Sequence, residues 1–85
     1  MIMFYVYVIK SKDYKWYYVG STKDVEKRLQ KHNTRQVKST KFRSPYELIY
    51  TEEFKTVDEA RKREKKIKIS RSTKEDIIKK FGPIV

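Results

Sequence analysis

Residues 2–10 hold the longest apolar run of this 85-residue chain and constrain its fold more than any other segment. The run is dense in β-branched and aromatic side chains, which favour a β-strand. Alternate side chains of a strand share a face, so one face is apolar throughout and the other carries the hydroxyl groups of Tyr5 and Tyr7. Spanning a bilayer takes roughly 20 apolar residues, so this shorter run predicts a strand of a soluble protein.

A second short strand is expected over residues 15–20, after a turn at residues 11–14. The two strands would then form a β-hairpin. A loop of four residues places Tyr7 opposite Tyr18, with Cβ atoms about 5 Å apart. A loop of five residues places Val19 opposite Tyr7 instead, and the sequence leaves both registers open.

Three helices and one further strand are expected beyond the hairpin. Cap residues at 21–24 open a helix that runs to about His32, and a polar, basic loop follows over residues 34–45. Residues 46–54 alternate as a third strand, with Tyr46, Leu48 and Tyr50 on one face and Glu47, Ile49 and Thr51 on the other.

Thr56 begins a capping box, and the helix after it runs to about Ile69. The last helix is expected to start with Ser72 as its cap, to end at Gly82 and Pro83, and to bury Ile77, Ile78 and Phe81. The element order predicts an α/β (α+β) fold in which about three helices flank a three-stranded, largely antiparallel sheet. We expect residues 1–85 to form a single domain.

Charge and aromatic content indicate the kind of partner. The chain has 22 Lys and Arg against 11 Asp and Glu, a net charge of +11, which favours a polyanionic partner. Seven tyrosines point towards nucleic acid, because a phenol combines a stacking face with a polar group. The absence of cysteine excludes disulfide scaffolds and thiolate zinc sites. With no signal peptide recognised, we expect a cytoplasmic protein without a membrane partner.

Helical spacing brings three polar residues towards the core. Arg28 and His32 share a helix face with Leu29, and Glu64 shares a stripe with Ile67. Each has a structural alternative, namely an ion pair of Arg28 with Asp24, a helix-capping role for His32, and an ion pair of Glu64 with Lys68. Tyr7 and Tyr18 could likewise be ordinary half-buried aromatics of a sheet.

Tyr5-Val6-Tyr7, followed after ten residues by Tyr18-Val19-Gly20, resembles the paired motif of the GIY-YIG nuclease family. The resemblance continues through Ser21-Thr22, Asp24 to Leu29, His32, and the segment from Ala60 through Glu64 to Lys68. It covers essentially the whole chain. The chain is most similar to small single-domain members, which resemble the N-terminal nuclease domain of the UvrC excision-repair subunit.

This resemblance implies metal-dependent endonuclease action on DNA with low sequence specificity, in DNA repair or processing. Tyr7 is then expected to be the general base, with its pKa lowered by Arg28 and the metal, while Tyr18 orients water or phosphate. Arg28 would grip phosphate oxygens, His32 would hydrogen-bond phosphate or a tyrosine, and Glu64 would bind Mg²⁺ or Mn²⁺.

The expected nucleic-acid contacts are Lys38, Lys41, Arg43 and Lys68, and the hydroxyl groups of Ser39 and Thr40 would assist in tracking phosphates. RNA and branched or single-stranded DNA are further candidate substrates. The alternative function is a nuclease-like module that binds DNA or RNA and has weak or no catalytic activity.

Overall fold

The computed structural model describes residues 2–81. Along the chain the elements are β1 (Phe4–Ser11), β2 (Tyr17–Thr22), α1 (Val25–Asn33), the 3₁₀ turn η1 (Lys41–Arg43), β3 (Tyr46–Phe54), α2 (Val57–Ile69) and α3 (Arg71–Phe81). The strands form one antiparallel sheet in the order β2-β1-β3. The predicted α+β fold, a three-stranded sheet with three helices, is confirmed.

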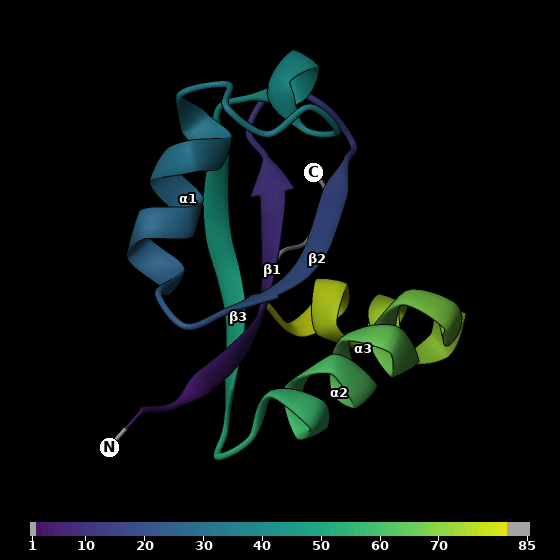
Figure 1. The fold of residues 1–85 in the computed structure, drawn as a ribbon. Coiled ribbons are helices and arrows are strands. Elements are labelled where there is room, and N and C mark those ends of the chain that lie inside the picture. Colours follow the sequence, from purple (N-terminus) through teal and green to yellow (C-terminus); the bar gives the residue numbers. More distant parts are fainter. Residues whose placement is uncertain (1, 82–85) are drawn as a thin grey trace.

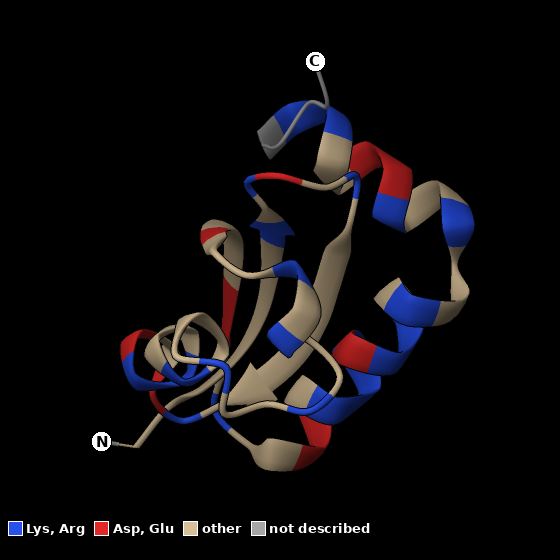
Figure 2. Cartoon of the chain, turned by 90° about the horizontal axis from the view of Figure 1, so that it is seen from above, with Lys and Arg blue, Asp and Glu red and all other residues tan. Residues whose placement is uncertain are grey.

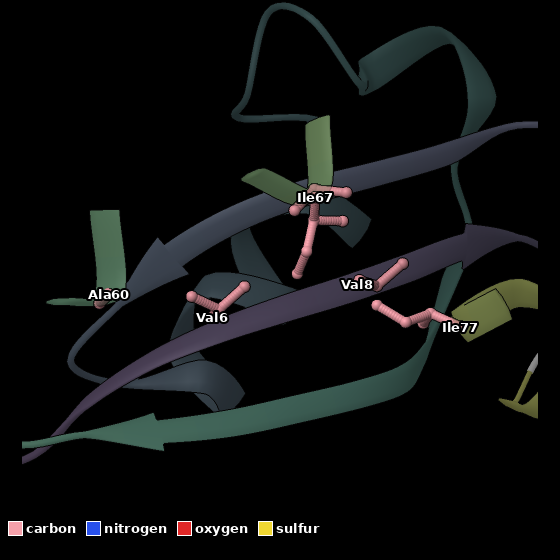
Figure 3. Close-up of a cluster of buried hydrophobic side chains, with 6 residues drawn as sticks. Val6, Val8, Ala60, Ile67 and Ile77 are labelled. Carbon is pink, nitrogen blue, oxygen red and sulfur yellow. The ribbon is translucent and has the colours of Figure 1, made fainter. Parts of the chain in front are cut away.

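The sheet is covered on both faces (Figure 1). On one face Val6 and Val8 of β1 pack against Ala60 and Ile67 of α2 and Ile77 of α3 (Figure 3). On the other face a second cluster of Tyr7, Ile9 and Tyr46 packs against Val25 and Leu29 of α1. Burial of each aliphatic side chain contributes about 1.5–3 kcal/mol, so β1, in the middle, holds the two layers together.

The β1–β2 register differs from both expected registers. Tyr7 lies opposite Gly20, the last pair of the β1–β2 ladder is Lys10 with Tyr17, and residues 12–16 form the loop between the strands. The backbone N–H of Ser11 donates to the carbonyl of Trp16 (2.9 Å), and the Tyr14 N–H donates to Ser11 Oγ (3.1 Å). These bonds close a wider loop than turn composition predicts. A loop of four residues would pair Tyr7 with Tyr18, and the observed register is shifted from that pairing by two positions along β2. Because the shift is an even number of residues, Tyr18 stays on the same sheet face as Tyr7.

The expected alternation of β3 is also wrong in its middle. The pairing with β1 shifts between Val8 and Ile9, which face Tyr50 and Leu48 respectively. Ile49 is the extra residue of a β-bulge, and it packs with Tyr50 against the same core cluster. A bulge adds a residue to one strand, so alternation inferred from sequence fails beyond it.

Side-chain caps set the helix ends. Asp24 accepts a hydrogen bond from the Lys27 N–H (3.0 Å) and Thr56 accepts one from the Glu59 N–H (3.2 Å), which confirms both predicted starts. The last helix starts earlier than predicted, because Ser70 rather than Ser72 accepts the N–H of Thr73 (3.4 Å).

Gly82 and Pro83, the expected stop of the last helix, lie outside the described residues, and Ile77 is buried as predicted. Across residues 2–81, every helix is too short or too polar to cross a membrane.

Candidate active site

Strands β1 and β2 place the two motif tyrosines side by side. Tyr18 lies diagonally across from Tyr7 on the same face, and their ring centroids are 6.2 Å apart. The Tyr7 ring lies directly over Gly20, where an added Cβ would approach Tyr7 Oη to 2.6 Å. Real Cβ atoms essentially never approach so closely, so glycine at this position allows the Tyr7 phenol to cross β2.

Four side chains form a hydrogen-bond chain through the site: Arg28, Tyr7, His32 and Thr40. Arg28 Nε donates to Tyr7 Oη over 3.4 Å, Tyr7 Oη lies 2.9 Å from His32 Nε2, and His32 Nδ1 lies 2.7 Å from Thr40 Oγ1. A guanidinium can only donate, so the Tyr7 hydroxyl proton is free to point at His32. We therefore assign His32 Nε2 as the acceptor and place the proton of the neutral ring on Nδ1, which donates to Thr40 Oγ1, because Thr40 Oγ1 itself donates to the Val37 carbonyl (3.4 Å).

His32 is a buried, neutral member of this chain. Burial lowers the pKa of His32 to about 4, and the positive charge of Arg28 acts in the same direction. The imidazole lies among the rings of Tyr18, Tyr7 and Tyr46, at centroid distances of 4.9, 5.8 and 6.0 Å. Both ring nitrogens face side chains, so the ring does not cap the end of α1.

The pKa of Tyr7 moves opposite to expectation. Burial raises it to about 12, and this outweighs the lowering by the Arg28 hydrogen bond. Tyr18 and Glu64 raise it further. Tyr7 is therefore a neutral phenol at pH 7 whose proton is directed at His32. The expected lowering by Arg28 and the metal did not take into account how deeply the central strand is covered, and without a metal burial outweighs the effect of Arg28.

Arg28 faces the tyrosines, and its side chain is half-buried. The hydrogen bond to Tyr7 raises the pKa of Arg28 above its usual value. The Asp24 carboxylate, its alternative partner, accepts the Lys27 backbone N–H at the start of α1. The guanidinium is thus held beside both phenols, where it can also donate to an anionic oxygen.

Glu64 lies at the outer edge of β2, and both of its carboxylate oxygens have partners. Oε1 accepts from Ser21 Oγ (2.6 Å), and Oε2 accepts from Lys68 Nζ (2.7 Å). Lys68 Nζ is 5.9 Å from the centroid of the Tyr18 ring, so the carboxylate and the phenols share this edge. The Glu64–Lys68 ion pair expected as the alternative is therefore present, next to the tyrosines.

Within residues 2–81 no three acidic, His or Cys side chains form a metal cluster. Mg²⁺ commonly takes only one or two protein carboxylates and completes its shell with water and substrate phosphate. Glu64 is a partly exposed carboxylate whose charge acts on Tyr7, the hydrogen-bond partner of Arg28, so a site with one carboxylate fits this donor set.

The basic loop of residues 34–45 is more structured than predicted. Lys38 is exposed, but Lys41 Nζ lies 4.9 Å from the centroid of the Phe42 ring and Arg43 Cζ lies 4.0 Å from that of Trp16. Thr40, expected to track phosphates, is buried against His32.

The sequence reasoning missed two further contributors to the site, Tyr46 and Ser21. Tyr46 Oη donates to the Thr40 carbonyl (3.0 Å), and Ser21 Oγ donates to Glu64. Ser21 follows the motif glycine directly and carried a usable signal, whereas nothing in the sequence pairs Tyr46 with Thr40.

The comparisons with known proteins agree with this geometry. The family of the GIY-YIG catalytic domain matches residues 3–76. The UPF0213 protein SSP2268 of Staphylococcus saprophyticus is 51% identical over 65 residues, covering 75% of this chain and 78% of its own. UPF0213 protein BH0048 of Halalkalibacterium halodurans is 39% identical over 82 residues, covering 93% and 86%.

The solution NMR structure of UPF0213 protein BH0048 from Bacillus halodurans has a TM-score of 0.58 and 36% identity. It covers 96% of this chain and 89% of its own. Family match, relatives and fold agree: the chain belongs to the GIY-YIG family and contains the nuclease-type domain of the small UPF0213 proteins.

Proposed function

We propose that this protein is a divalent-metal-dependent endonuclease that hydrolyses DNA phosphodiester bonds with low sequence specificity. The observation that carries the proposal is the hydrogen-bond chain from Arg28 through Tyr7 to His32, lying at the same sheet edge as Glu64. Hydrolysis of a phosphodiester needs an oriented water and stabilisation of charge on the phosphate oxygens. The protein supplies a candidate residue for each of these two requirements.

Tyr7 is the proposed general base, which accepts a proton from the attacking water and relays its own proton to His32. Its proton points at His32 Nε2, so the phenolic oxygen keeps a lone pair with which to accept a hydrogen bond from water. As the water attacks phosphorus and the P–O bond to the leaving oxygen breaks, the water proton passes to Tyr7 Oη and the Tyr7 proton moves to His32 Nε2. A second water protonates the leaving oxygen, and His32, whose pKa is about 4, returns its extra proton to solvent through Tyr7. This relay needs no free phenolate, which matters because the pKa of Tyr7 is about 12.

Arg28 and Glu64 complete the proposed site. Arg28 binds a non-bridging phosphate oxygen with the guanidinium nitrogens that do not contact Tyr7. Glu64 would hold Mg²⁺ or Mn²⁺, which neutralises charge on the phosphate when bound. Tyr18, which acts on Arg28, and Lys68, which pairs with Glu64, lie near each other and would orient the scissile phosphate.

The excess of basic residues supports a nucleic-acid substrate. Lys and Arg recur along α2 and α3 (Figure 2). This distribution suits contacts to a phosphate backbone, which carry little sequence information. Low sequence specificity is the expected consequence.

Supercoiled plasmid tests the proposal. Wild-type protein should nick it in Mg²⁺ or Mn²⁺ and leave it intact in EDTA. The rival function is a DNA-binding module without catalysis, and the ion pair that already occupies Glu64 favours it. Tight binding to the plasmid with no nicking in either metal would establish the rival and refute the nuclease.

A further inference from the structure

Two exposed aromatic side chains lie at one end of the sheet, outside the hydrogen-bond chain. Phe42 in η1 is 73% exposed and Trp16 in the β1–β2 loop is 39% exposed. The β1–β2 loop and η1 lie at the same end of the sheet (Figure 1). Exposed large aromatics that gather at one place indicate a binding surface.

The two segments are fastened to each other. Ser11 Oγ donates to the Arg43 carbonyl (2.6 Å), and the Lys12 N–H donates to the Pro45 carbonyl (2.9 Å). Arg43 then stacks on the Trp16 ring, with its Cζ 4.0 Å from the ring centroid. The loop and η1 therefore form one preorganised surface, which we name the stacking surface: Trp16 and Phe42 with the cations Lys41 and Arg43.

Charge identifies the partner of this surface. Lys41 Nζ lies 4.9 Å from the centroid of the Phe42 ring, and Lys12 and Lys15 precede Trp16 in the β1–β2 loop. Residues 11–16 and 38–45 contain a single acid, Asp13. Aromatic faces interleaved with cations suit an unpaired nucleobase and its phosphates, because bases stack on the rings while Lys and Arg neutralise the backbone. An apolar protein partner would not need these cations.

The stacking surface also adjoins the candidate active site. Thr40 directly precedes η1 and contacts His32 Nδ1, and Trp16 is two residues before Tyr18. A DNA strand whose backbone lies at Arg28 would thus bring its neighbouring nucleotides to Trp16 and Phe42.

We propose that the stacking surface binds unpaired bases of single-stranded DNA next to the cleavage site, so that the protein prefers DNA with single-stranded segments over continuous duplex. This inference rests on the proposed function for its choice of nucleic acid. Duplex bases are stacked on each other and cannot reach the rings, whereas unpaired bases can.

The test is DNA binding in EDTA, with a labelled single-stranded oligonucleotide and its duplex. Phe42→Leu and Trp16→Leu should each weaken single-strand binding about tenfold and change duplex affinity little. Trp16→Phe keeps an aromatic face and should retain most of the affinity. Ile69→Ala removes an equally exposed apolar side chain of α2 (74%) and should have no effect.

Salt and fluorescence give two further readouts. The leucine variants should leave the slope of log affinity against log salt unchanged, whereas Lys41→Ala should reduce it by about 0.7 for single strands. Trp16 is the only tryptophan, so its fluorescence should be quenched by single-stranded DNA and not by duplex.

Equal losses for single strand and duplex in the leucine variants, or unchanged fluorescence, would overturn the inference. Because EDTA prevents metal-dependent cleavage, these results stand apart from the nicking assay. A protein that nicks plasmid while its leucine variants bind single strands normally would refute the stacking surface and leave the nuclease intact. Selective binding of single strands through the two aromatic rings, with no nicking of plasmid, would support the stacking surface and refute the nuclease.

Discussion

His32 provides a direct physical test of the site, because it is the only histidine in the chain. Burial lowers its pKa from the ordinary 6.5 to about 4. In the unfolded chain the ring takes up a proton as the pH falls through about 6.5, while in the folded protein it stays neutral until about pH 4. Acid therefore favours the unfolded state in this window.

The magnitude follows from the two pKa values. At about 1.4 kcal/mol for each pH unit, His32 makes the folded state about 3 kcal/mol less stable at pH 4 than at pH 7. The part of the folding stability that depends on His32 ionisation is fully present above about pH 6.5 and is lost progressively as the pH falls towards 4. For a small domain whose total stability is about 5–15 kcal/mol, this is a large fraction.

NMR of the single imidazole measures this effect without a variant. The folded ring should titrate near pH 4, and its ¹⁵N shifts at pH 7 should show a protonated Nδ1 and an accepting Nε2. Urea unfolding at several pH values gives the stability, and His32→Gln removes the His32 contribution while all carboxylates remain. A midpoint between 6 and 7 for the folded ring, or the opposite tautomer, would refute the hydrogen-bond chain as drawn.

Three further substitutions test neighbouring parts of the site. Thr40→Val leaves the buried His32 Nδ1–H without an acceptor and should lower the free energy of unfolding in urea by about 1–3 kcal/mol. Thr40→Ser keeps the hydroxyl group and should retain most of the wild-type stability. Gly20→Ala forces the Tyr7 ring aside and should cost about 1–3 kcal/mol, measured in the same way. Tyr7→Phe should slow plasmid nicking about 10²–10⁴-fold. Its stability should fall no further than that of Tyr46→Phe, which also loses a buried hydroxyl bond.

The sequence predicted the strands and helices well because their signals are local. Alternating apolar residues, the Asp24 cap and the Thr56 cap each act within a few positions, and all three appear in the structure. The hairpin register depended on Ser11, whose side chain bonds both the Tyr14 N–H and the distant Arg43 carbonyl. Turn composition contains no information about that second contact.

In the candidate site, too, local sequence patterns predicted some features, and contacts between distant segments determined the others. Helical periodicity placed Arg28 and His32 on the core-facing side of their helix, and the structure brings both to Tyr7. The direction of the Tyr7 pKa could not be predicted, because it depends on the helix that covers the central strand. The role of Thr40 depends on how the basic loop folds back onto α1, which no local pattern encodes.

We propose that metal-dependent cleavage depends on one carboxylate at the edge of β2. Glu64→Gln tests it most directly, because the amide oxygen can still accept from Ser21 Oγ while the negative charge that a metal requires is lost. Glu52→Gln, which alters the carboxylate paired with Arg63, serves as the matched control.

The measurement is the rate of plasmid nicking in Mg²⁺, with DNA affinity in EDTA measured in parallel. We expect Glu64→Gln to lose nicking and keep its DNA affinity, and Glu52→Gln to keep both. Nicking by Glu64→Gln at the wild-type rate would rule out Glu64 as the metal ligand.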